Sequence, residues 1–406
     1  MDRIAEGFVK LALAIGEHDP LYVDAYFGPE AWRERARREK KSLEEIRTAA
    51  GPLIADLEKL DASREEEPLR LRRAFLIKQL ESLVARVIML EGTKLSFDEE
   101  SKALYDVAAP RRDERRLREA LGRIDSLVPP GEGTLLDRLE RFKKDFVIPK
   151  DRLEAVFTAA IAEARKRTKE HIPLPADESF TVEYVTGQSW GAYNWYKGSN
   201  RSVIQINTDF PTYIDAPLGL ACHEGYPGHH VQNVLLEQDL VKGRGWIEFT
   251  VSPLFSPLSP INEGAASFGI EVAFPGDSRY EFERDVLYPL AGVDPAKAEV
   301  YDAIRNLLRE VHCAETEAAR QYLDGEITAE EAARYLSVNA LMSLERARRL
   351  VTFFDQYRSY IVNYDVGYDL VKSFIERGGG TADRPEKRWD ELRALISFPR
   401  VPSELE

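Results

Sequence analysis

Three histidines and a glutamate fall close together in the middle of the chain. The segment from Cys222 to His230 reads Cys-His-Glu-Gly-Tyr-Pro-Gly-His-His and holds three of the six histidines. Imidazole nitrogens and carboxylate oxygens are common protein ligands of Zn²⁺. A hydrolytic zinc site also needs a base that acts on water. The residue types in this segment therefore predict a hydrolytic metal centre.

The spacing departs from the common helical zinc motif, in which two histidines lie one turn apart. The residue four positions after His223 is Pro227, and the next histidines are His229 and His230. On an undisturbed helix, residues seven apart lie about 10 Å apart along the axis, too far for one ion with bonds of about 2 Å. Pro227 and Gly228 interrupt a helix and permit unusual backbone angles. We therefore expect a bulge that brings one later histidine beside His223.

A third ligand is expected from the segment Asn262-Glu263-Gly264, which follows Pro260. The proline and the small residues after Glu263 predict a second helix that packs closely against its neighbour. Glu263 would then supply a ligand oxygen, and Glu224 would be free to act as a base. The alternative interpretation is that the histidines only cap or pack a Pro-Gly turn.

The pattern H-E-x-x-P-G-H, followed by a separate helix with N-E-x-x-A, resembles the bacterial family known as domain of unknown function 885. That family is similar in turn to the glutamate-zincin (thermolysin-like) metallopeptidase clan. The resemblance runs from about Phe180 to about Glu376. It implies a mainly helical body with a small β-sheet next to the cleft of a zinc helix.

The resemblance also implies roles for single residues. His223, His229 and Glu263 would bind one zinc ion, and Glu224 would be the general base. Between the two adjacent histidines, the family pattern favours His229 as the ligand. His230 would then orient another group from outside the ligand set.

A tyrosine-rich segment near the C-terminus offers groups for the oxyanion. Tyr360, Tyr364 and Tyr368 are spaced by four, which places them on one helical face. A tyrosine hydroxyl or an arginine can stabilise the negative charge on an attacked carbonyl oxygen. The family carries a tyrosine followed shortly by glycine here, which implies Tyr364, and Tyr360 and Arg358 are further candidates. The alternative is an aromatic stripe that only packs.

A small sheet is predicted just before residues 218–235, which hold the motif and which we call the zinc segment. Residues 180–184 and 202–207 alternate in polarity as half-buried strands do. Residues 193–198 contain aromatic residues and are predicted to form a turn. In the clan that the chain resembles, an edge strand beside the cleft pairs with an extended substrate. The sheet would otherwise only brace the zinc helix. The residues that would line the cleft are Gly191, Tyr193, Asn194 and Asn207.

The rest of the chain predicts helices that position these groups. Apolar periodicity and turn residues predict helices over residues 97–108, 113–127, 132–146, 150–170 and 294–324. Ser63 and Glu66 predict a capping box ahead of a further long helix, and Thr328 caps another with Glu331. His312 and Glu315 lie one turn apart. They form either a rival metal pair or a hydrogen bond at the cleft wall.

Composition limits the class of protein. The chain has 406 residues, a net charge of −14 and 44% hydrophobic residues, which suits a globular body with a sizeable core. The acidic balance argues against nucleic acid as a partner. Two cysteines imply no disulfide framework, and no signal peptide or membrane span is evident. These features predict a cytoplasmic location.

Two regions and one function are predicted from these observations. Prolines after His171 divide an N-terminal helical region, 1–175, from a zincin-like catalytic region with C-terminal helices, 176–406, in one integrated body. The predicted function is zinc-dependent hydrolysis of peptide bonds in short peptides. The alternatives are a zinc hydrolase or lyase that acts on a non-peptide amide or ester, and a catalytically inactive helical binding protein. The intact Glu224 argues against the last.

Overall fold

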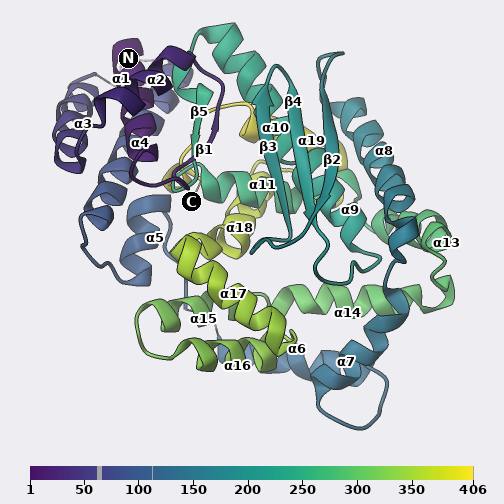
Figure 1. The fold of residues 1–406 in the computed structure, drawn as a ribbon. Helices are drawn as coiled ribbons and strands as arrows, with labels where there is room; N and C mark the ends of the chain where they lie inside the picture. Colours follow the sequence, from purple (N-terminus) through teal and green to yellow (C-terminus); the bar gives the residue numbers. More distant parts are fainter. Residues whose placement is uncertain (62–65, 112, 406) are drawn as a thin grey trace.

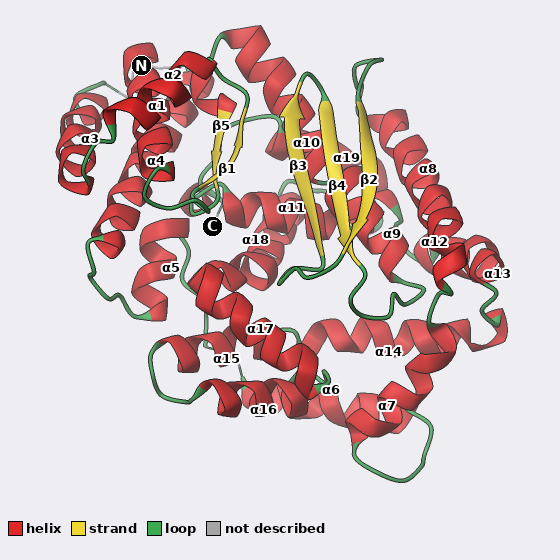
Figure 2. Cartoon of the chain, in the orientation of Figure 1, coloured by secondary structure: helices red, strands yellow, loops and turns green. Residues whose placement is uncertain are grey.

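The computed structural model of the chain describes residues 1–61, 66–111 and 113–405. Within these residues the protein is mainly helical with small sheets, which confirms the predicted fold class (Figure 2). No helix in the described part is long and apolar enough to cross a membrane.

In the described part of the chain, eight α-helices come before the three-stranded sheet. They are α1 (Asp2–Gly16), α2 (Glu30–Glu39), α3 (Leu43–Glu58), α4 (Glu67–Leu90), α5 (Phe97–Tyr105), α6 (Glu114–Leu127), α7 (Leu135–Lys143) and α8 (Leu153–His171). Reciprocal capping boxes start α3, α5 and α7, since each begins after a serine or threonine with an acidic residue three positions on. The predicted box at Ser63 lies outside the described residues, and α4 begins directly after Glu66.

The sheet before the zinc segment has three strands in the order β2-β4-β3. They are β2 (Ser179–Val185), β3 (Ala192–Gly198) and β4 (Arg201–Asn207). β2 is parallel to β4, and β3 is antiparallel to it. The prediction of a turn within residues 193–198 was wrong. Those residues form the edge strand β3, because the reversal is made by Ser199 and Asn200, which adopt φ of 54° and 60°.

A second, two-stranded sheet joins distant parts of the chain. β1 (Val23–Tyr26) pairs antiparallel with β5 (Val251–Pro253). Figure 1 shows this pair on one side of the three-stranded sheet, beside β3, with α8 on the other side. The N-terminal segment therefore reaches the region of the predicted zinc site.

The helices after the sheet complete the body. They are α9 (Ala216–Leu220), α10 (His229–Leu235), α11 (Ser259–Ala273), α12 (Ser278–Phe282), α13 (Tyr288–Ala291), α14 (Ala298–Val311), α15 (Cys313–Leu323), α16 (Ala329–Asn339), α17 (Leu344–Tyr357), α18 (Val362–Arg377) and α19 (Pro385–Ile396). The helix predicted over residues 294–324 is interrupted at His312. Around this residue the backbone hydrogen bonds span three residues and tighten the turn between α14 and α15.

The buried apolar side chains form two clusters. The first joins α1, α3, α4 and α5 with α15, α16 and α17. The second joins α8, the zinc segment, α11 and α19. The zinc segment is therefore held in the second cluster, through residues such as Leu218, Cys222 and Val231.

Candidate metal centre

The zinc segment is a helix broken at the Pro-Gly pair. α9 runs into a π-helical turn over Ala221–Gly225, the chain leaves the helix at Tyr226, and α10 begins at His229. The Gly228 N–H donates to the Cys222 carbonyl at 2.9 Å, so the chain folds back onto the preceding turn. A Cβ on Gly228 would lie 1.9 Å from the His223 carbonyl oxygen. Only glycine permits this approach.

This fold-back brings together the predicted ligand groups. The His223 and His229 ring centroids lie 4.7 Å apart, with the rings perpendicular. Oε2 of Glu263 lies 3.2 Å from Nε2 of His223 and 3.7 Å from Nε2 of His229. One ligand atom from each of the three residues lies within 4.8 Å of the others.

The donor set fits a divalent metal ion. Oε2 of Glu263 is buried, and within the described residues it has no hydrogen-bond partner, although two imidazole nitrogens lie 3.2 Å and 3.7 Å from it. Burying a carboxylate oxygen without a hydrogen bond is costly. Two imidazoles and one carboxylate are the protein ligands of a common class of hydrolytic zinc site. An ion shared by the three groups would remove the cost of burying the unpaired oxygen.

A close helix crossing positions Glu263. A Cβ on Gly264 in α11 would lie 2.1 Å from the Gly367 carbonyl oxygen in α18, so the two helices touch backbone to backbone. The segment before α18 contributes Tyr360, whose hydroxyl donates to Oε1 of Glu263 at 2.7 Å. The carboxylate is thereby oriented from the side away from the histidines.

Glu224 lies beside the cluster. It is 5% exposed, and the Asn194 side-chain amide of the edge strand β3 donates to its backbone carbonyl at 2.7 Å. Among the described residues, no hydrogen bond reaches its carboxylate. Burial raises the pKa of Glu224, although His223 and His229 favour the charged form. A carboxylate with a raised pKa suits a group that takes up and returns a proton.

The charged groups of the cluster shift one another's pKa values. Burial disfavours a charged imidazole at His229, yet the carboxylates of Glu263 and Glu224 outweigh it and raise its pKa to about 9. Burial also works against a charged Glu263, but the two imidazoles lower its pKa overall. The metal-free site therefore holds a proton that a metal ion must displace.

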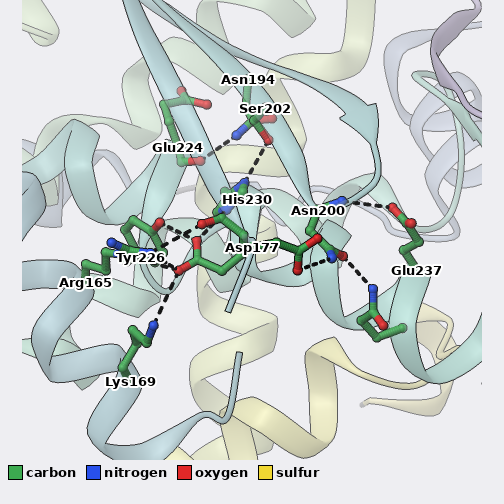
Figure 3. Close-up of polar contacts among 12 residues, drawn as sticks. Arg165, Lys169, Asp177, Asn194, Asn200, Ser202, Glu224, Tyr226, His230 and Glu237 are labelled. Carbon is green, nitrogen blue, oxygen red and sulfur yellow. Dashed lines mark hydrogen bonds and ion pairs between the residues drawn. The ribbon is translucent and has the colours of Figure 1, made fainter. Parts of the chain in front are cut away.

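His230 belongs to a separate buried network behind the cluster. Its Nδ1 lies 2.8 Å from Ser202 Oγ (Figure 3). Its Nε2 lies 3.1 Å from Glu178 Oε2, so both ring nitrogens are engaged. Tyr226 and Arg165 also donate to the Glu178 carboxylate. Burial opposes the charge on Glu178, but these bonds lower its pKa to about 2. The network braces the backbone on both sides of Pro227.

The structure separates the other predicted residues into two groups. Tyr360 and Tyr364 lie at the cluster, and Tyr364 is 37% exposed with no hydrogen bond to its hydroxyl in the described part. Tyr193 also lies there. The Asn207 amide instead donates to the backbone of the loop before β3, and the Arg358 guanidinium is engaged by the buried Glu100 at 2.6 Å.

Sequence reasoning singled out His312 but missed two acidic residues, Asp24 and Glu178. His312 is exposed between α14 and α15 and belongs to no metal-ligand cluster in the described part of the chain. By contrast, Asp24 in β1 accepts a hydrogen bond from the Tyr193 hydroxyl. Burial raises the pKa of Asp24 to about 6, and the charges of His229, Glu263 and Glu224 also affect this pKa. The network residue Glu178 was missed as well. Neither Asp24 nor Glu178 belongs to a recognisable sequence motif. Each reaches its place only through the packing of distant segments, so sequence reasoning could not find it.

The comparisons with known proteins concern the fold. No family model and no curated protein matches the sequence. One similar solved structure is a protein classed as a lipoprotein from Colwellia psychrerythraea, which is 16% identical, with a TM-score of 0.57, over 92% of this chain and 68% of that chain. Another is the M32 carboxypeptidase from Deinococcus radiodurans R1, which is 14% identical, with a TM-score of 0.50, over 100% of this chain and 92% of that chain.

The chain therefore shares its overall fold with the M32 carboxypeptidase from Deinococcus radiodurans R1. At these identities the likeness concerns the arrangement of the chain and not its activity. Membership of the domain of unknown function 885 family stays a prediction, because no family model matches.

Proposed function

We propose that the protein is a metal-dependent hydrolase that cleaves peptide bonds, with one zinc ion held by His223, His229 and Glu263. One observation carries the proposal. The buried Oε2 of Glu263 faces two imidazoles and has no hydrogen-bond partner among the described residues. The carboxylate of Glu224 is close enough to both imidazoles for their charges to lower its pKa against the effect of burial, and in the described part of the chain it accepts no hydrogen bond. The metallopeptidase-like fold supports the same conclusion.

The proposed mechanism assigns one task to each side chain. A zinc ion held by His223, His229 and Glu263 would supply the Lewis acidity that attack by water near neutral pH needs. Glu224 takes a proton from the attacking water and delivers it to the leaving amine. The Tyr364 hydroxyl, which has no other partner among the described residues, donates to the oxyanion on the attacked carbonyl.

The edge strand beside the cluster suggests how a peptide is held. β3 is paired on one side with β4 and forms the edge of the three-stranded sheet. Its Asn194 contacts the backbone of Glu224, so the strand runs past the cluster. An extended peptide that adds to this edge would present its backbone to the metal, with little dependence on its side chains. This favours short, extended peptides as substrates.

The test combines elemental analysis with two variants. We expect the purified protein to hold about one zinc per chain and to cleave peptides more readily than small amides or esters. Glu224→Gln should keep the metal and lower kcat by about 100-fold or more, because it removes the base. Glu263→Gln should lose the metal. Full turnover by metal-loaded Glu224→Gln protein would contradict the mechanism.

A further inference from the structure

A buried carboxylate from the N-terminal part of the chain holds the segment that carries Tyr360. Glu100 lies in α5 and is fully buried. Its Oε1 accepts hydrogen bonds from the Ser359 backbone N–H at 3.0 Å and from the Ser359 hydroxyl at 2.6 Å. Its Oε2 accepts a third bond from the Arg358 Nε–H at 2.6 Å. These bonds tie α5 to the junction of α17 and α18, beside which it lies in Figure 1.

The backbone at this junction needs support from its surroundings. Arg358 ends α17 with φ of 54° and ψ of −127°, a conformation that residues other than glycine rarely adopt. Such a conformation costs free energy and persists only where neighbouring groups fix it. Glu100 binds the side chain of Arg358 and the peptide N–H that follows it, so it stabilises the turn in this conformation.

The next residue along the chain reaches the candidate metal centre. Tyr360 directly follows Ser359 and is buried, and its hydroxyl donates to Oε1 of Glu263 at 2.7 Å. Its ring also packs edge to face against Tyr105 of α5, with the two ring centroids 6.0 Å apart. Helix α5 therefore holds Tyr360 in two ways, through Glu100 at the backbone before it and through Tyr105 at its ring.

The two oxygens of Glu263 have different surroundings. Tyr360 binds Oε1, whereas Oε2 faces His223 and His229 and has no hydrogen-bond partner among the described residues. Because one oxygen is fixed by the tyrosine, the place of the Tyr360 hydroxyl decides where the other oxygen points. Metal–ligand bonds tolerate deviations of only about 0.2 Å. A small shift of the turn before Tyr360 would therefore disturb the ligand geometry.

We propose that Glu100 is a positioning residue of the metal centre, which acts through Tyr360 to set the direction of the Glu263 carboxylate. This inference rests on the proposed function and adds a residue from outside the proposed ligands and base. The alternative is that Glu100 only stabilises the packing of α5. The two roles differ in one respect, because only a positioning residue loses its effect on zinc binding once the Tyr360 hydroxyl is removed.

A double-mutant cycle with zinc affinity as its readout separates the two roles. Glu100→Ala removes all three hydrogen bonds and should weaken zinc binding by about tenfold in a titration against a competing chelator. In Tyr360→Phe protein the same change should alter the zinc affinity by less than about twofold, because the hydroxyl through which Glu100 acts is already absent. Equal losses of affinity in both backgrounds would show that Glu100 supports only the fold, and would overturn the inference.

Two further variants accompany the cycle, and circular dichroism checks that each protein is folded. Glu34→Ala, the same change at an exposed residue of α2, should keep the zinc affinity of the wild type. Ser359→Ala removes only the 2.6 Å bond from the hydroxyl and should weaken zinc binding by about threefold, which keeps the inference testable if Glu100→Ala protein does not fold. Zinc affinity within about 1.5-fold of the wild type in every folded variant at Glu100 and Ser359 would contradict the inference.

Denaturant unfolding of the metal-free protein keeps the inference separate from the proposed function. We expect the double variant to shift the unfolding midpoint by less than the sum of the two single shifts, because Glu100→Ala already displaces the Tyr360 hydroxyl from Glu263. This result supports the inference even if the wild-type protein binds no zinc, in which case the proposed function alone fails. Fully additive shifts would refute the positioning role of Glu100, whatever the zinc affinity.

Discussion

Replacing Gly228 by alanine should damage the metal centre without changing any ligand side chain. The new Cβ would lie 1.9 Å from the His223 carbonyl oxygen and 2.4 Å from that of Cys222. Both are backbone atoms, so no side chain can swing aside. The Pro-Gly turn must move away from the preceding turn, and His229 follows Gly228 directly in the chain.

The size of the movement follows from these distances. Cβ atoms essentially never approach other atoms closer than 3.0 Å, so the turn must shift by at least about 1.1 Å. Metal–ligand bonds tolerate only about 0.2 Å. The shift should therefore detach His229 and leave two ligands. We expect the dissociation constant for zinc to rise by about 100-fold or more, which corresponds to about 2.8 kcal/mol.

Zinc titration against a competing chelator measures this change, and circular dichroism checks that the variant is folded. Gly219→Ala is the matched control, because it lies in the same zinc segment and its added Cβ would meet nothing within 4 Å. That control should keep the affinity of the wild type. A folded Gly228→Ala protein with zinc affinity within threefold of the control would refute the argument that the fold-back creates the site.

Two further predictions concern the tyrosines and pH. Tyr360→Phe removes the 2.7 Å hydrogen bond to Glu263 and should weaken zinc binding by about 10- to 100-fold in the same titration, whereas Tyr364→Phe should keep zinc and lower kcat. In the metal-free protein, protonated His229 contributes stability that is fully present below pH 6.5 and is lost as the pH rises through about 9. Thermal melts should show this loss, and calorimetry in buffers of different ionisation enthalpy should detect a proton released on zinc binding below pH 9.

Local chemistry made several elements predictable. Thr328 and Glu331 predict the start of a helix, because both hydrogen bonds of a capping box form within four consecutive residues. The structure contains this capping box at the start of α16. The strand over residues 193–198 was not predictable in the same way. Its aromatic residues become a strand by pairing with β4, and the reversal moves to Ser199 and Asn200. Likewise, the periodicity over residues 294–324 does not reveal the tightened turn at His312.

By itself, the sequence determined which residue types the centre could contain. The motif around His223 and the separate Glu263 identify candidate ligands and a base, since this chemistry depends on side-chain identity and short spacing. Tertiary structure decided how these groups meet. The fold-back at Gly228 sets the distance between the imidazoles, and the crossing of α11 and α18 aims Glu263 at them. Asp24 reaches the same space only through the pairing of β1 with β5, because contacts between distant segments depend on packing that no local pattern encodes.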